Sequence, residues 1–69
     1  MKVNSSTITD IDRELVDGKL FLKVTFKNGS EYLYEGVPAN IYEEFLMSSS
    51  NGKYLHENIA NRYNYTRIK

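Results

Sequence analysis

The residues best suited to chemistry lie near the C-terminal end, where cationic and aromatic side chains alternate. No acidic residue follows Glu57. This basic-aromatic segment contains Arg62, Tyr63, Tyr65, Arg67 and Lys69. Guanidinium and ammonium groups contact phosphates, and tyrosine rings stack on unpaired bases. We therefore identify the segment as the candidate nucleic-acid-binding surface. The alternative is a solvated basic tail with two packed tyrosines.

No group of residues indicates catalysis or metal binding. His56 is the only histidine and the chain has no cysteine, so neither a second imidazole nor a thiolate is available to a metal. A general base needs a positioned partner, and no local motif would activate the serines of the run 48–50, which suit helix capping. Gly29, Gly36 and Gly52 are too far apart to form a phosphate loop. We expect a protein that is not an enzyme and requires no metal or cofactor.

Length and charge narrow the class of protein further. The chain has 69 residues, which allow one domain over residues 1–69 with a small core. Nine basic and nine acidic residues cancel, which argues against a strongly cationic nucleic-acid binder but not against a local basic patch. Neither a signal peptide nor an apolar run long enough to span a membrane is present. We expect a cytoplasmic protein without a membrane partner.

Three strands are expected over residues 5–16, 19–27 and 30–36. Asp17-Gly18 is a two-residue turn signal that pairs the first two strands and places Ile11 opposite Val24. The same register places Asp12 opposite Lys23, an opposite-charge pair on the other face. Ile8 is out of phase with the first strand by one residue, and a bulge between it and Ile11 would restore the alternation.

Two helices are expected after the sheet. Pro38 suits a first helical turn, and an apolar stripe follows at Ile41, Tyr42, Phe45 and Leu46. The run 48–52 ends this helix, and Ser50 or Asn51 can cap the next, which presents Leu55, Ile59 and Tyr63. Residues 63–68 alternate and form either an extended tail or an edge strand. The predicted fold is α+β: a three-stranded antiparallel β-meander with two short α-helices on one face and room for a short C-terminal strand.

The second hairpin decides where Tyr32 and Tyr34 point, because a one-residue slip exchanges the two faces of a strand. If Asn28-Gly29 forms a two-residue turn, both tyrosines lie on the outer face. There they would join Phe21, Lys23 and Lys27 as a basic surface with stacking platforms. That register also buries Glu31 beside Phe26, at a cost of several kcal/mol.

A three-residue loop over residues 27–29, with Gly29 in the left-handed region, gives the other register. It places Tyr32 opposite Val24 and Tyr34 opposite Leu22, so both rings face the core. We favour this register because it sends every charge outward. Either turn requires a positive φ at Gly29.

The order and spacing of these residues resemble the KTSC domain over nearly the whole chain. The resemblance rests on Ser5-Ser6-x-Ile8, Leu22-x-Val24-x-Phe26-x-x-Gly29-x-x-Tyr32-x-Tyr34-x-Gly36-Val37-Pro38, Ser50-x-Gly52-x-Tyr54-Leu55, Ile59 and Tyr63-x-Tyr65. The resemblance marks Tyr32, Tyr34, Gly29, Gly36, Pro38 and Gly52 as structural hallmarks. Ala60 departs from the family pattern, in which this position is often basic. The family occurs at the C-terminus of some lysyl-tRNA synthetases and as stand-alone small proteins, which implies RNA as a partner.

We therefore expect a small non-catalytic binding module whose partner is RNA. The alternative is a protein–protein interaction or homo-oligomerisation module, in which an edge strand pairs between chains and Phe21 and Leu33 act as outer-face apolar anchors. The two classes differ in their response to salt. Phosphate contacts weaken steeply as salt rises, whereas an apolar interface hardly changes.

Overall fold

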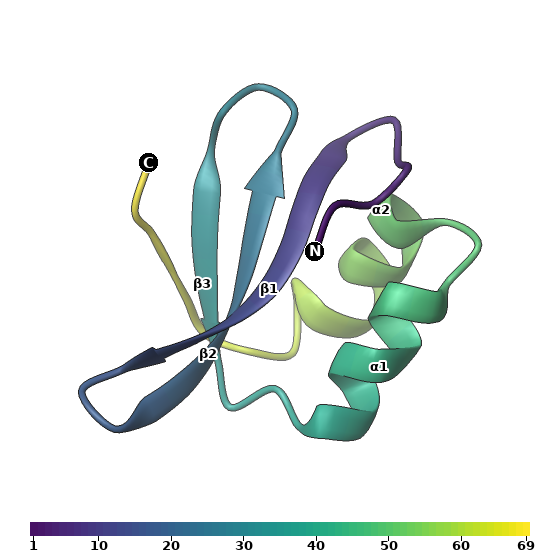
Figure 1. Cartoon of the computed structure of the whole chain (residues 1–69). Helices are drawn as coiled ribbons and strands as arrows, with labels where there is room; N and C mark the ends of the chain where they lie inside the picture. The colour runs from purple at the N-terminus through teal and green to yellow at the C-terminus, as the bar shows by residue number, and fades with distance from the viewer.

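A four-stranded antiparallel sheet with helices on one face forms the molecule (Figure 1). The computed structural model describes residues 1–69. Its elements are β1 (Ile8–Val16), β2 (Lys19–Phe26), β3 (Glu31–Glu35), α1 (Ala39–Met47), α2 (Asn51–Tyr54), η1 (Leu55–Ile59) and β4 (Tyr65–Arg67). The strands lie side by side in chain order, and β4 pairs with β3 at the edge. The α+β prediction is confirmed, and residues 63–68 contain a fourth strand. None of the helices has the length and apolarity needed to cross a membrane.

The first hairpin has the predicted register. Ile11 pairs with Val24 and Asp12 with Lys23, and a register shift between Ile8 and Asp10 provides the expected bulge. β1 begins at Ile8 rather than at residue 5. The hydroxyl of Ser5 accepts hydrogen bonds from the N–H groups of Thr7 (3.2 Å) and Ile8 (3.3 Å), so the preceding residues form a local turn instead of a strand.

The second hairpin has the three-residue loop that charge placement favours. Tyr32 pairs with Val24 and Tyr34 with Leu22, so both tyrosines lie on the helix side of the sheet. Gly29 has a φ of 92°, as both turn types require. The predicted register and the predicted glycine conformation are therefore both confirmed.

α1 begins one residue later than the sequence suggests. Pro38 is its N-cap in an extended conformation rather than a residue of the first helical turn. The Pro38 carbonyl accepts hydrogen bonds from Ile41 and Tyr42, both at 3.1 Å. Gly36, with a φ of 70°, turns the chain out of β3 just before this point. Both residues thus set the angle at which the chain leaves the sheet.

The second helix differs from the regular helix that we expected. α2 lasts for only four residues before it widens into the π-helical segment η1, where the Ala60 N–H donates to the Leu55 carbonyl at 2.8 Å. Ser50 is the N-cap residue, but its hydroxyl makes no capping bond. The buried Asn51 instead donates from Nδ2 to the Phe45 carbonyl at 2.7 Å, which ties α2 to the end of α1.

The two faces of the sheet have opposite character. The inner face and the helices enclose one core, formed by Ile8, Ile11, Leu22, Val24, Tyr34, Val37, Phe45, Leu55 and Ile59. By the alternation of the paired strands, the outer face carries Asp10, Asp12, Glu14, Glu31 and Glu35. Ion pairs with the Met1 amino group, Lys2, Lys23 and Lys69 offset four of these five carboxylates, so most charges of this face are already paired.

A hydrogen bond between side chains also joins α1 to α2, and its donor, the Tyr54 hydroxyl, loses its proton at alkaline pH. The Tyr54 hydroxyl donates to Glu44 at 2.8 Å, and burial followed by this partner raises the pKa of Tyr54 to about 12. A tyrosine in an unfolded chain titrates near 10. The folded protein thus holds the proton more tightly, so this contribution to stability is complete below about pH 10 and is lost as pH rises towards 12.

Tyr54→Phe is therefore expected to reduce the loss of stability at alkaline pH. Urea unfolding monitored by circular dichroism across this pH window would measure the loss in the wild type and in the variant. The free energy of unfolding should still fall with pH in the variant, but less steeply, because burial also raises the pKa of Tyr34. Tyr42→Phe is the matched control, because the Tyr42 hydroxyl forms no protein hydrogen bond. Identical slopes for the wild type and Tyr54→Phe would contradict the assignment.

Candidate nucleic-acid interface

A row of aromatic rings lies on the helix side of the sheet, along β2, β3 and β4. The Tyr32 ring stacks on Tyr65 at 5.1 Å between centroids, and Phe26 meets Tyr32 edge-on at 5.3 Å. Tyr34 lies 6.3 Å from Tyr32 and 5.6 Å from Tyr65. We call Phe26, Tyr32, Tyr34 and Tyr65 the aromatic row.

Exposure differs sharply along this row. Tyr34 is 3% exposed and belongs to the core, as expected, whereas Tyr32 is only half-buried and Tyr65 is 54% exposed. We expected both central tyrosines to be largely buried, and Tyr32, although partly exposed, also packs against the core. The helix side of the sheet is not fully covered at the β3–β4 edge. Stacked rings therefore reach solvent there.

Pairing between β3 and β4 brings the predicted C-terminal residues to this place. Tyr65 lies opposite Tyr34, and Arg67 lies opposite Tyr32. Because side chains alternate along a strand, Tyr65 and Arg67 share the face of the aromatic row. Two residues of the predicted basic-aromatic segment thus meet the central tyrosines, although more than thirty residues separate them in the sequence.

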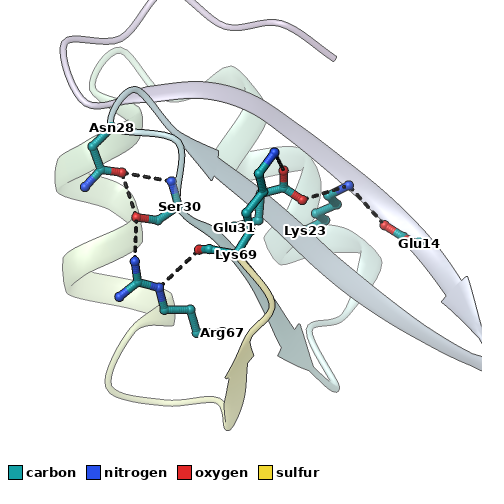
Figure 2. Close-up of polar contacts among 7 residues, drawn as sticks. All are labelled: Glu14, Lys23, Asn28, Ser30, Glu31, Arg67 and Lys69. Carbon is teal, nitrogen blue, oxygen red and sulfur yellow. Dashed lines mark hydrogen bonds and ion pairs between the residues drawn. The ribbon is translucent and has the colours of Figure 1, made fainter.

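Polar contacts hold Arg67 in position (Figure 2). Its Nε donates to the Lys69 carbonyl at 3.1 Å, and its Nη2 donates to the Ser30 hydroxyl at 3.4 Å. The buried Ser30 in turn donates from its hydroxyl to Asn28 Oδ1 at 2.7 Å. The guanidinium lies 5.9 Å from the centre of the Tyr32 ring. Its Nη1 group makes no protein hydrogen bond, so a donor is available beside the rings.

Lys69, unlike Arg67, lies beside a carboxylate side chain. Its ammonium lies 4.0 Å from Glu31, which also accepts Lys23 at 3.3 Å (Figure 2). Lys23 contacts Glu14 at 3.6 Å as well, and the hydrogen bond with Glu31 is the main cause that raises the pKa of Lys23. Asp12, although opposite Lys23, forms its ion pair with the Met1 amino group. Both lysines are therefore partly neutralised by carboxylates.

Arg62 and Tyr63 lie apart from the aromatic row. They follow η1 in a turn in which both N–H groups donate to the Ile59 carbonyl, at 3.1 and 3.2 Å. Tyr63 is half-buried against the core, whereas Arg62 is exposed and forms no ion pair. The predicted segment thus divides into a pair that joins the row, Tyr65 and Arg67, and residues that do not.

Sequence reasoning missed three residues of this surface. Phe26 extends the row at its β2 end, and Asn28 and Ser30 position Arg67. Asn28 and Ser30 flank the turn glycine, and the Asn28 side chain also accepts the Ser30 N–H at 3.0 Å. A polar residue two positions before another in a tight turn is a visible signal of such a contact. The contact between Ser30 and Arg67 depends on the pairing of β4 with β3, which the turn residues alone do not predict.

Comparison with known proteins identifies the family. The family model of the KTSC domain matches residues 4–63. The chain belongs to the KTSC domain family. The crystal structure of a KTSC domain protein from Yersinia pestis is similar, with a TM-score of 0.83 and 26% sequence identity over 100% of this chain and 94% of that chain. No curated protein sequence matches this chain.

The hallmark glycines and proline of this KTSC domain act in the backbone. Gly29 and Gly36 adopt positive φ, and Pro38 caps α1. Gly52 allows a close approach, because a Cβ added there would lie 2.8 Å from Thr7 Oγ1. The family match ends at residue 63, so Tyr65 and Arg67 lie beyond it. The hallmarks therefore describe the scaffold and the central tyrosines, and the edge strand adds the cation.

Proposed function

We propose that this KTSC domain is a non-catalytic module that binds single-stranded RNA on the aromatic row. The observation that supports this most is the stack of the partly exposed Tyr32 on the exposed Tyr65, with the guanidinium of Arg67 beside it. Exposed aromatic rings bind bases through stacking, which tolerates sequence variation, and a neighbouring arginine contacts the phosphate. The rings need little reorganisation, because they are already aligned.

Electrostatics favours this face over the other. The outer face of the sheet carries carboxylates on β1 and β3, and its central cation, Lys23, is already paired with Glu14 and Glu31. A phosphate chain would therefore have to displace these carboxylates to reach Lys23. On the aromatic row the nearest charge is Arg67. The neutral chain offers few further cations, so binding should be weak and should depend mainly on stacking.

The test is a fluorescence-anisotropy titration of a single-stranded RNA oligonucleotide at two salt concentrations. Tyr65→Ala should weaken binding by about 5- to 100-fold, the usual range for losing one base–ring stack. Arg67→Ala should make the slope of log K against log salt less steep by about 0.7, the value of one phosphate contact. Lys23→Ala is the matched control and should bind like the wild type.

Two outcomes would contradict this proposal. Loss of binding in Lys23→Ala with normal binding in Tyr65→Ala would move the site to the outer face. If the wild type binds no RNA at low salt, the interaction-module alternative takes over.

A specific observation favours that alternative: Leu15 and Leu20 pair at the tip of the first hairpin and are 69% and 43% exposed. Sedimentation of the wild type and of Leu15→Lys would then show whether this tip joins copies of the chain.

A further inference from the structure

A cavity of about 580 Å³ opens beside the aromatic row. It lies between the end of β2, the segment before β1, and the helical stretch of α2 and η1. Its lining includes Phe26, Asn28, Tyr34, Leu55, His56 and Ala60. The backbone N–H of Lys27 donates to the Thr7 carbonyl at 2.8 Å, which fixes the N-terminal segment against the hairpin. The volume falls within the usual range for small-molecule sites, about 300–1,000 Å³.

The hydroxyl of Tyr34 is a hydrogen-bonding group at this cavity that has no protein partner. Tyr34 is 3% exposed, yet its hydroxyl makes no hydrogen bond with the protein. The oxygen is also not sealed from solvent, since no buried side-chain oxygen or nitrogen lacks a partner. This cavity is the only one that Tyr34 lines, so the hydroxyl opens into it. A tyrosine phenol is protonated at neutral pH and able to donate, and burial raises the pKa of Tyr34 further.

The charge and chemistry of the lining indicate the kind of ligand. No carboxylate lines this cavity, and Lys27 is the cationic side chain in its lining. By contrast, Glu35 lines two of the other cavities, and the remaining one contains no hydrophobic residue. Aromatic and aliphatic walls with a hydroxyl donor and an amide suit a flat heterocycle with hydrogen-bond acceptors. A cation at the rim suits an attached phosphate.

The cavity is continuous with the aromatic row. Phe26 and Tyr34 belong to both, because each lines the cavity and each contacts Tyr32 through its ring. A strand stacked on Tyr65 and Tyr32 would therefore have its next base at the entrance. The widened helix contributes to the opposite wall, because Leu55 and Ala60 are the two ends of the π-helical hydrogen bond.

We propose that this cavity binds one unstacked nucleobase of the RNA, whose acceptor takes the hydrogen bond of the Tyr34 hydroxyl and whose phosphate lies near Lys27. The inference rests on the proposed function, because the strand on the aromatic row delivers the base. It adds a site that recognises one base by its edge, beside a surface that stacks any base. The smallest ligand that contains both recognised parts is a nucleoside 5′-monophosphate.

Amide chemical-shift mapping by NMR tests the cavity directly. The four ribonucleoside 5′-monophosphates are titrated separately into the wild-type protein, with ribose 5-phosphate as the control ligand. At least one nucleotide should shift the amides of Gly52 and Ala60, whereas ribose 5-phosphate should not. Tyr34→Phe should weaken this binding by about 3- to 10-fold, the value of one hydrogen bond. Tyr42→Phe removes a phenolic hydroxyl outside the cavity and should bind normally.

A second variant fills the space instead of removing a donor. Ala60→Leu should abolish the nucleotide shifts, whereas Ala39→Leu, the same change on the exposed start of α1, should preserve them. Circular dichroism confirms that each variant is folded. In the Ala60→Leu background, the second substitution Tyr65→Ala should still weaken oligonucleotide binding, because the stacking surface is unchanged. The two proposals can therefore be tested separately, because the cavity is tested at Ala60 and the stacking surface at Tyr65.

Three results would overturn the cavity proposal. They are the absence of nucleotide-induced shifts at Gly52 and Ala60, equal shifts with ribose 5-phosphate, and unchanged nucleotide affinity in both Tyr34→Phe and Ala60→Leu. Each can occur while RNA still binds in a Tyr65-dependent way, which would leave the proposed function standing. The opposite combination is also possible: Tyr34→Phe weakens nucleotide binding, but neither Tyr65→Ala nor Arg67→Ala changes RNA binding. That result would support the cavity and reject the stacking surface.

Discussion

Tyr34→Ala should unfold a large share of the protein at room temperature. The Tyr34 side chain is almost fully buried in the core that includes Leu22, Val24 and Phe45. Removing a large buried aromatic side chain costs roughly 3–5 kcal/mol, and a core of this size supplies roughly 3–5 kcal/mol in total. The cost of the substitution thus equals the stability available. Urea unfolding followed by circular dichroism measures the effect.

Tyr34→Phe is the control for this prediction. It preserves the ring and removes only the hydroxyl, which makes no protein hydrogen bond, so the folded state should persist with a similar unfolding midpoint. The same variant then serves for nucleotide binding, where loss of the hydroxyl should matter. A Tyr34→Ala protein with the wild-type midpoint would show that the ring is not part of the core and that the hairpin register is wrong.

Phe45→Ala should have a comparable effect from the other layer. Phe45 is completely buried, and its ring stacks on Tyr54 at 5.7 Å. The Phe45 carbonyl also accepts the Asn51 side chain, so movement of this turn would leave a buried amide without its partner. We expect a loss of roughly 3–5 kcal/mol, measured as for Tyr34→Ala.

Met47→Ala, two residues further along α1, is the control for Phe45→Ala. Met47 is 86% exposed, and its replacement should change the free energy of unfolding by less than about 0.5 kcal/mol. Phe45→Leu should lie between the two, because it retains much of the apolar volume. If Phe45→Ala proves no more destabilising than Met47→Ala, helix α1 is not packed on the sheet as the structure has it.

Local rules were sufficient for the hairpins. A turn glycine, alternating apolar residues and the cost of burying Glu31 together selected one register, which placed Tyr34 in the core correctly. The same rules could not show that Tyr32 stays partly exposed. Its exposure depends on how far the helices extend across the sheet, which is a property of tertiary packing rather than of strand alternation.

The edge of the sheet and the second helix were harder to predict for different reasons. Residues 63–68 alternate as a strand does, but only three of them form β4, and short segments carry a weak signal. The widening of the second helix at Leu55 has no counterpart in its apolar spacing, because Leu55 and Ile59 face the core in either helix type. The wall of the cavity thus follows from hydrogen bonding that spacing does not specify.

If the domain binds RNA as proposed, the short strand β4 would make that binding depend on a conformational equilibrium. Tyr65 and Arg67 reach the aromatic row only while β4 pairs with β3, and all three residues of β4 are exposed. Edge segments with little buried area are the first to open. The apparent dissociation constant equals the intrinsic one divided by the fraction of molecules in which the strand is docked. Affinity in this domain would therefore be tuned by sheet-edge pairing as much as by the contacts themselves.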